Sequence, residues 1–121
     1  MKFKIAGKEY DLKFGIKFIR TLDEVYRVDS DGLEFGMGVH LAFMNLNHYS
    51  PSALAEVIKA SVAHESSPPK IYQIDEAIEQ FAEENDGLGQ LFEDVLDELG
   101  KSPVIKDTLK QFKQNAKVEQ N

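Results

Sequence analysis

The chain has 121 residues, of which 42% are hydrophobic, and a net charge of −7 at pH 7. This length allows one domain with a sizeable core, and no apolar run approaches the ~18 residues that a membrane helix needs. The absence of cysteine excludes disulfides and cysteine-ligated metals, which suits a reducing cytoplasm.

The charges divide the chain into blocks. Residues 71–100 contain ten acidic residues and neither Lys nor Arg, whereas residues 1–20 and 101–121 are net basic. Nucleic-acid phosphates require clustered Lys and Arg, so a general nucleic-acid-binding surface is disfavoured. The acidic block is either a solvated face that keeps the protein soluble or a docking face for a basic partner.

Residues 2–13 are predicted to form a β-hairpin, because apolar and polar side chains alternate through the stretch FKIAGKEYDL. A two-residue turn of type II′ at Gly7-Lys8 fits, since such turns place glycine in the first central position. This turn sets the pairs Phe3 with Leu12, Ile5 with Tyr10, and Lys4 with Asp11. An isolated hairpin is only marginally stable in water, so its apolar face is expected to cover helices.

The helical part 15–64 follows the hairpin. Apolar residues at helical spacing predict three helices in it, over 15–27, 37–47 and 50–65. Ser50 is the expected N-cap of the third helix, with Pro51 as its first residue. The stretch VDSDG, between the first two helices, is expected to be a polar turn.

The acidic helical part 71–100 is predicted to form two more helices. The apolar residues of the second helix, from Leu88 to Leu99, fall at offsets of 0, 3, 4, 7, 8 and 11, which is the clearest amphipathic pattern in the chain. Such a stripe is expected to face the core. Gly100 is expected to follow the end of this helix.

A C-terminal helix is predicted over 103–115, with Ser102 as its N-cap and Pro103 as its first residue. Residues 117–121 are expected to form a frayed tail. The apolar stripe of this helix is narrower than that of 88–99, which favours a partner-binding surface. The residues predicted for that surface are Ile105, Lys106, Leu109, Lys110, Phe112 and Lys113.

Together the elements predict an α+β fold that is mainly α. An N-terminal two-stranded β-hairpin is followed by about five or six packed helices, in a single domain over residues 1–116. The stretch SSPPK is the only plausible subdivision, and each half would be small for a domain of its own.

Glycines at 32, 36 and 38 precede the second helix, in the stretch GLEFGMGVHLAF. A phosphate-binding P-loop would need a lysine after its last glycine, where Val39 stands. A dinucleotide-binding loop would need a third glycine, where Leu41 stands. The cluster is therefore interpreted as a turn at Gly32 and as close helix packing at Gly36 and Gly38.

No catalytic or metal-binding pattern emerges from the sequence. A calcium loop that began at Asp29 would need a glutamate at its twelfth position, which His40 occupies. The three histidines lack the i, i+4 spacing of a helical zinc site. The carboxylates of 75–98 lie largely opposite apolar stripes, where they stay solvated. We therefore expect no enzyme, no cofactor and no metal site.

Three stretches together resemble a known family: YDLKFGIKFIRTL, GLEFGMGVHLAF with SALAEVIKASV behind it, and FEDVLDELGKS. They run from about Tyr10 to about Ser102 and resemble the tail assembly chaperones of long-tailed bacteriophages, particularly those that infect Gram-positive bacteria. The marker residues of the resemblance are structural ones: Gly32, Phe35, Gly36 and Gly38.

The resemblance implies a chaperone that works in the cytoplasm of the bacterial host and is absent from the finished virion. Such proteins keep the very long tape measure protein soluble until tail tube subunits polymerise around it. The tail tube protein, a longer frameshifted form of the chaperone and further copies of the chain are additional expected partners. Nucleic acid and membranes are not expected partners.

Two alternatives remain open on the sequence. A small acidic phage or bacterial regulator, or a nucleic-acid mimic, would bind a basic protein through residues 71–100, and salt would weaken that contact. A small hydrolase or metal enzyme would need a carboxyl with a raised pKa or a histidine cluster, and the sequence indicates neither.

Overall fold

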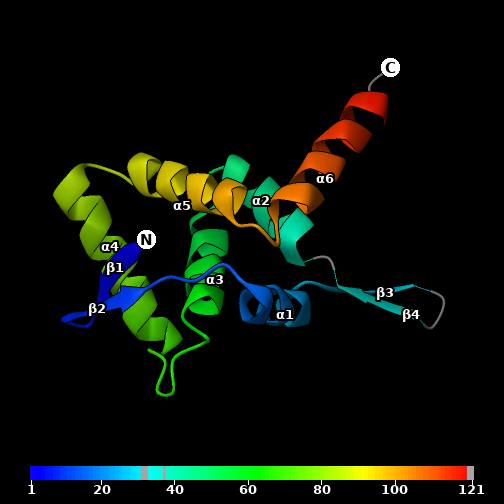
Figure 1. Ribbon diagram of the computed structural model, residues 1–121. Helices are drawn as coiled ribbons and strands as arrows, with labels where there is room; N and C mark the ends of the chain where they lie inside the picture. Colours follow the sequence, from blue (N-terminus) through cyan, green and yellow to red (C-terminus); the bar gives the residue numbers. More distant parts are fainter. Residues whose placement is uncertain (31–32, 37, 120–121) are drawn as a thin grey trace.

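Two β-hairpins and six α-helices make up the part of the chain that the structure describes (Figure 1). The computed structural model describes the backbone of residues 1–30, 33–36 and 38–119, and the side chains of residues 1–26 and 38–114. The strands are β1 (Lys2–Ile5), β2 (Lys8–Asp11), β3 (Arg27–Ser30) and β4 (Leu33–Gly36). The helices are α1 (Ile16–Val25), α2 (Gly38–Asn47), α3 (Pro51–Ser61), α4 (Ile71–Asn85), α5 (Gly89–Lys101) and α6 (Lys106–Glu119). The predicted fold, mainly helical with an N-terminal two-stranded hairpin, is confirmed.

The first hairpin pairs β1 with β2, but its turn lies one residue earlier than predicted. Ala6 and Gly7 form the turn, and both have positive φ, of 50° and 80°, as a type I′ turn requires. The predicted turn at Gly7-Lys8 is therefore wrong. Asn, Asp or Gly normally occupies the first central position of a type I′ turn, so nothing in the sequence marked Ala6 as a turn residue.

The predicted pairing of the hairpin is consequently wrong by two residues. The observed pairs are Lys2 with Asp11, Phe3 with Tyr10, Lys4 with Glu9, and Ile5 with Lys8. A shift of two residues keeps every side chain on its own face, since side chains alternate along a strand. The side chains predicted to face the helices are accordingly buried: Phe3, Ile5, Tyr10 and Leu12.

The second hairpin was not predicted. β3 pairs with β4 in a register that joins Arg27 to Gly36 and Ser30 to Leu33. The stretch VDSDG was predicted to be a polar turn, although an Asp-Gly pair between two alternating segments is a strong hairpin signal. The turn assigned to Gly32 lies outside the described residues. In Figure 1 the hairpin extends away from the helices beyond α1.

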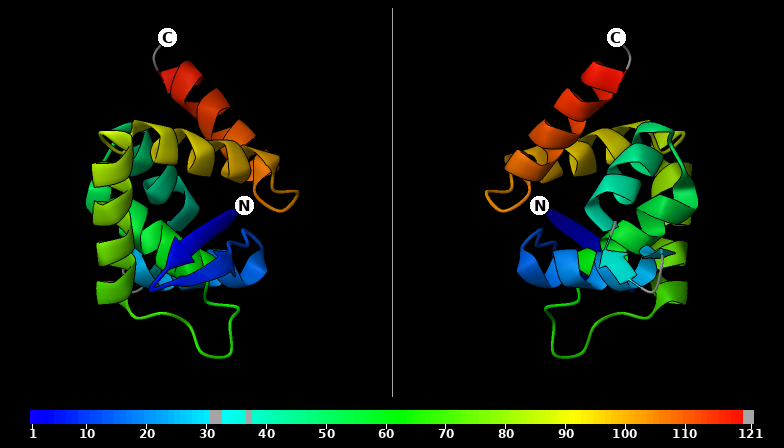
Figure 2. Two further views of the ribbon diagram at one scale, coloured as in Figure 1. Left: turned by 90° about the vertical axis from the view of Figure 1, so that its left-hand side faces the viewer. Right: turned by 90° about the vertical axis from the view of Figure 1, so that its right-hand side faces the viewer.

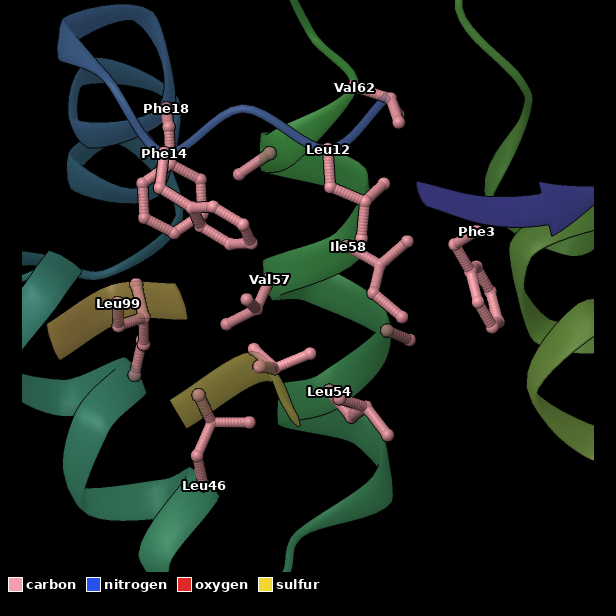
Figure 3. Close-up of a cluster of buried hydrophobic side chains, with 14 of the residues drawn as sticks. Phe3, Leu12, Phe14, Phe18, Leu46, Leu54, Val57, Ile58, Val62 and Leu99 are labelled. Atoms are coloured by element: carbon pink, nitrogen blue, oxygen red, sulfur yellow. The ribbon is translucent and has the colours of Figure 1, made fainter. Parts of the chain in front are cut away.

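The helix α3 lies at the centre of the hydrophobic core (Figure 3). Ser50 caps it by accepting a hydrogen bond from the Ala53 N–H, as predicted. Leu54, Val57 and Ile58 are fully buried on this helix. Side chains from distant parts of the chain surround them: Leu12, Phe14, Leu46 and Leu99. The core therefore joins the first hairpin to the C-terminal helices.

The helix α5 buries its apolar stripe, as the spacing predicted. Its buried residues are Leu91, Phe92, Val95 and Leu99. The ring of Tyr49, from the turn between α2 and α3, stacks on Phe92 with ring centroids 4.8 Å apart and planes inclined by 4°. The apolar side of α5 is therefore packed against the rest of the chain.

Gly38 lets α1 and α2 approach each other closely. A Cβ atom on Gly38 would lie 2.5 Å from the carbonyl carbon of Leu22, so no larger residue fits without movement of the backbone. The side chain of Asp23 then accepts a hydrogen bond of 3.0 Å from the Gly38 N–H. This bond satisfies one of the free amides at the start of α2. The close packing predicted at Gly38 is confirmed.

The boundary between α5 and α6 differs from the prediction. Gly100 lies within α5, which continues to Lys101, and Ser102 caps the end of that helix. The buried hydroxyl of Ser102 donates a hydrogen bond of 2.6 Å to the carbonyl oxygen of Phe14. Ser102 is therefore not the N-cap of α6, because its hydroxyl is held by a segment 88 residues earlier.

The helix α6 begins at Lys106 rather than at Pro103 and runs to Glu119, past the end predicted at residue 115. Its first part packs against α2 and α5. Its C-terminal part points away from the other helices in all views (Figures 1 and 2). This arrangement leaves one side of α6 open beside the end of α5.

Candidate protein-binding groove

A groove lies where the C-terminal end of α5 meets α6. Its volume is about 330 Å³, and it is lined by Gly100, Lys106, Leu109, Lys110, Lys113 and Gln114. We call it the lysine groove. Gly100 contributes no side chain, and nothing lies within 4 Å of the position that its Cβ would take. The α5 wall of the groove is therefore low and open to solvent.

Helical spacing brings the lysines together along the groove. Lys106, Lys110 and Lys113 follow one another at intervals of four and three residues, which places them on one side of α6. All three are exposed, whereas Leu109, between them, is only 4% exposed and forms the apolar floor. The groove thus combines an apolar base with a cationic rim.

The structure divides the predicted partner-binding residues into two groups. Ile105 is completely buried and Leu109 nearly so, and both belong to the hydrophobic core. Phe112 is half-buried. Only the three lysines of the predicted surface are exposed. The apolar stripe of α6 is therefore largely covered by the chain itself.

Phe112 holds α6 against α2. Its ring centroid lies 5.3 Å from that of His40 and 5.9 Å from that of Phe43. Lys113 reaches over the ring of Phe43, with its Nζ 5.3 Å from the centroid. Aromatic contacts of this kind fix the direction of a helix, so they set how the lysine groove opens beside α5.

The lysine groove is a positively charged surface. In the part of the chain that the structure describes, no ion pair joins Lys106, Lys110 or Lys113 to a carboxylate. An apolar floor with uncompensated cations around it suits a helix that carries both an apolar ridge and carboxylates.

Two other ionisable groups, His64 and Tyr26, take part in structural contacts. His64 lies with its Nε2 2.8 Å from the carbonyl oxygen of Asp11, which ties the end of α3 to β2. Burial raises the pKa of Tyr26, which ends α1, and the nearby carboxylate of Glu56 adds to that rise; a hydrogen bond with Asn45 opposes it. Within the described residues, no group of three or more His, Cys, Asp or Glu side chains is placed to hold a metal ion.

Gly100 was not predicted as part of the groove. Gly100 was assigned to a helix end, and no local pattern connects it with a helix that begins six residues later. Only the packing of α5 against α6 makes it a groove residue. Of the marker residues, Gly38 has the contact role described above. Phe35 and Gly36 belong to β4, and the surroundings of both residues lie outside what the structure describes.

A protein-family model described as phage tail assembly chaperone protein, TAC, matches residues 2–114. The chain belongs to the phage tail assembly chaperone family. The matched range includes the first hairpin, all six groove-lining residues and the close contact at Gly38. A search of the curated proteins and a search of the solved structures found no match to this chaperone.

The family fixes the general role of the protein in phage tail assembly. The resemblance recognised in the sequence is thereby confirmed at the level of the family. Among the described helices of the chaperone, none is both long enough and apolar enough to cross a bilayer.

Proposed function

We propose that this chaperone binds the tape measure protein of a long-tailed phage and keeps it soluble while the tail tube assembles. Membership of the tail assembly chaperone family is the observation that carries the proposal. A long helical protein exposes apolar stripes until a tube encloses it, and such stripes associate with one another in water. The chaperone would cover them in the cytoplasm of the bacterial host, without catalysis.

The lysine groove is the surface that we assign to this contact. A helix of the partner would place an apolar ridge over Leu109 and the aliphatic stems of the lysines. Carboxylates on the flanks of that helix would meet the ammonium groups of Lys106, Lys110 and Lys113. The contact is small, so each copy binds weakly, and release is possible when the tube arrives.

The predicted partner-binding residues then have two tasks. Ile105 and Phe112 hold α6 on α2 and α5, where Ile105 is fully buried and Phe112 contacts His40. Leu109 and the three lysines provide the surface itself. The tail tube protein and a longer frameshifted form of the chaperone are further partners that we propose on the family resemblance alone.

Co-expression with the tape measure protein of the same phage tests the proposal. The expected result is that the tape measure protein is insoluble alone and soluble with the chaperone, and that the two proteins purify together. An insoluble tape measure protein in the presence of well-folded chaperone, with no complex recovered, would contradict it. A tape measure protein from an unrelated phage serves as the control for a general effect on solubility.

A second candidate function rests on the acidic side of α4. Asp75, Glu76 and Glu79 are exposed there, which suits a small acidic regulator or nucleic-acid mimic that binds a basic protein. Such a contact would dissociate at moderate salt, since exposed charges are screened over about 8 Å at physiological ionic strength. A partner recovered from host cells only at low salt, and unrelated to phage tails, would favour this second function.

A further inference from the structure

The first hairpin has one covered edge and one open edge. On the β2 side, the carbonyl oxygen of Asp11 lies 2.8 Å from the Nε2 of His64. Just after β2, the Lys13 N–H donates a hydrogen bond of 2.9 Å to the carbonyl oxygen of Ser61. The end of α3 therefore covers the edge of β2. On the other side of the hairpin, β1 lies beside α4 (Figures 1 and 2).

The space between β1 and α4 is a groove of about 260 Å³, which we call the edge groove. One side of it is formed by Lys2, Phe3, Lys4 and the turn after β1, and no residue of β2 is among the described residues that line it. The other side is α4 from Gln73 to Glu84, with residues at offsets of 0, 3, 4, 7, 8 and 11 that share one face of the helix. That stretch of helix is about 16 Å long, the length of an extended segment of about five residues.

The backbone of β1 directs hydrogen-bonding groups into the edge groove. The Leu12 N–H donates a hydrogen bond of 2.8 Å to the carbonyl oxygen of Met1. Bonded and non-bonded pairs alternate along an antiparallel ladder, so Phe3 bonds to β2, whereas the N–H and C=O groups of Lys2 and Lys4 point away from β2. In the described part of the chain, no backbone group outside the hairpin is hydrogen-bonded to the backbone of either lysine.

The strand β2 shows which residues β1 accepts as neighbours. The stretch Glu9–Asp11 runs antiparallel to Lys2–Lys4. Its two acidic residues stand opposite the two lysines on the exposed face, and Tyr10 stands opposite Phe3 on the buried face. A segment with the same alternation of acidic and apolar residues would make the same cross-strand pairs on the open edge of β1.

The helix α4 provides an apolar floor for the inward side chains of such a segment. Phe81 is half-buried, and its ring centroid lies 6.4 Å from that of Phe3 on the buried face of the hairpin. Ala77, one helical turn before Phe81, also lines the groove. Successive side chains of a strand point to opposite faces, so the acidic side chains of the segment would point away from α4.

We propose that the edge groove binds an extended segment of a partner protein, in which acidic and apolar residues alternate, as a third antiparallel strand beside β1. Charge complementarity selects this occupant. Lysines on an edge strand discourage pairing with a wholly apolar strand, whereas carboxylates directly opposite them are favourable. Hydrogen bonds with the backbone of Lys2 and Lys4 would provide affinity, and the alternating side chains would provide specificity.

This site goes beyond the proposed function and does not rest on it. The edge groove lies on the first hairpin and α4, whereas the lysine groove lies on α5 and α6. One copy of the chaperone would therefore hold an extended segment and a helix at two separate places. A contact with about five residues is small for a protein interface, so the extended segment is expected to bind weakly.

A titration of the full chain with a blocked peptide, acetyl-EVEVE-amide, followed by NMR, tests the proposal. The backbone amide signals of Lys2 and Lys4 and those of α4 beside the groove are expected to shift and to saturate. The basic peptide acetyl-KVKVK-amide is expected to leave these signals in place. The chain has a net charge of −7, so general attraction would favour the basic peptide, and a preference for the acidic one reports the groove itself.

N-methylated peptides test the antiparallel strand. In an antiparallel pair, the residues opposite Lys2 and Lys4 exchange both backbone hydrogen bonds with them, and these residues are the glutamates of the peptide. Methylation of the glutamate N–H groups is expected to weaken binding about tenfold, because it removes the donors. Methylation of the valine N–H groups, which point away from β1, is the matched control and should retain binding.

Neutral variants test the two lysines. Lys2→Gln with Lys4→Gln is expected to weaken binding of acetyl-EVEVE-amide about fivefold, because two cross-strand charge pairs are lost. Lys17→Gln with Lys59→Gln, at exposed lysines outside both grooves, changes the net charge equally and should bind like the wild type. Circular dichroism and thermal unfolding midpoints show that the variants are folded. The N-methylated peptides test the site in the unmodified chain.

Four outcomes would overturn the proposal: no shifts with the acidic peptide, equal binding of the basic peptide, equal loss with both methylated peptides, or unchanged binding in the neutral variant of Lys2 and Lys4. Protection of β1 that rises with the concentration of the chaperone alone would make a second copy the occupant and would also overturn it.

A variant with Lys106→Glu, Lys110→Glu and Lys113→Glu separates this proposal from the proposed function. It is expected to bind acetyl-EVEVE-amide like the wild type. Loss of peptide binding in that variant would contradict a separate edge groove. Failure of the peptide titration, together with a solubilised tape measure protein in the co-expression experiment, would remove the edge groove and leave the proposed function standing. The reverse pair of results would remove the proposed function alone.

Discussion

The helices α5 and α6 both carry an apolar stripe of helical periodicity, but the two stripes are buried to different extents. On α5 the stripe is packed into the core, where Leu91, Phe92 and Val95 are 0–2% exposed. On α6, Ile105 is buried, Phe112 is only half-buried, and the lysines beside Leu109 are exposed. A helix can therefore be anchored by one side of its stripe and present the adjacent side to a partner.

This difference separates residues that stabilise the fold from residues that bind. Changes in the body of the protein should lower the free energy of unfolding, and binding should fall only through unfolding. Changes on the exposed side of α6 should lower binding with little effect on stability.

Phe92→Ala should have the largest effect. Phe92 is 2% exposed and supports the stacked ring of Tyr49, so truncation leaves a cavity and a ring without its contact. The expected loss is about 3–5 kcal/mol of unfolding free energy, measured by urea denaturation. Tyr49→Ala, at a ring that is 50% exposed, is the matched control and should cost clearly less. Equal losses would contradict the core position of α5.

Gly38→Val tests the close contact of α1 with α2. The new side chain would meet the backbone of Leu22 and Asp23 at 2.5–2.6 Å, and backbone cannot move aside as a side chain does. We expect a loss of about 3 kcal/mol in the same denaturation experiment. Gly89→Val, where nothing lies within 4 Å of the added Cβ, should cost much less; an unaffected Gly38 variant would show that the helices are further apart.

Ser102→Ala should have an intermediate effect at the junction of α5 and α6. It removes the donor to the buried carbonyl oxygen of Phe14, and an unpaired buried polar group costs about 1–3 kcal/mol. Thermal unfolding measures the change. Ser66→Ala, in the exposed loop before α4, is the control. A loss no larger than that of the control would mean that water replaces the hydroxyl.

The triple change of Lys106, Lys110 and Lys113 to glutamate should scarcely alter stability. Exposed substitutions change the unfolding free energy by about 0.5 kcal/mol or less each. Binding of the tape measure protein should nevertheless be lost, as measured by recovery of the complex after co-expression. The control with Lys13, Lys17 and Lys59 changed to glutamate should retain the complex. Retained binding in the groove variant would place the partner surface elsewhere.

Tyr26→Phe should change how the stability of the protein depends on pH in alkaline solution. Burial raises the pKa of Tyr26 above its ordinary value of 10.0, so folding favours the protonated hydroxyl. Its contribution to stability is complete below the unfolded pKa of about 10 and is lost as the pH rises through the folded pKa. The wild type should therefore lose more stability than the variant between pH 8 and pH 11, in urea denaturation. Parallel curves would contradict the shift.

The sequence predicted the elements better than the connections between them. The stripe of α5 identified core residues because burial on one helix face leaves a period of 3.6 residues. The register of the first hairpin could not be chosen from alternation, since a shift of two residues keeps Phe3 and Tyr10 on the same face. The conformation of Ala6 decides the register of this hairpin, and alanine gives no local sign that it will take a positive φ.

The candidate site was predicted in part. The lysines were found because helical spacing places Lys106, Lys110 and Lys113 together. The groove itself was not predicted, because it depends on Gly100 lying beside α6 and on Phe112 turning toward His40. Such contacts between separate helices follow from tertiary packing. The burial of Ile105 could not be predicted for the same reason, and it changes this residue from a proposed contact to an anchor.

Hydrogen–deuterium exchange of the chaperone, measured alone and in complex with the tape measure protein, tests whether the lysine groove binds that protein. Amides from about Gly100 to Gln114 are expected to exchange more slowly in the complex, because a helix bound in the lysine groove protects the end of α5 and the first turns of α6. Unchanged exchange in that range, with protection confined to α4 or the first hairpin, would show that the tape measure protein does not bind in the lysine groove.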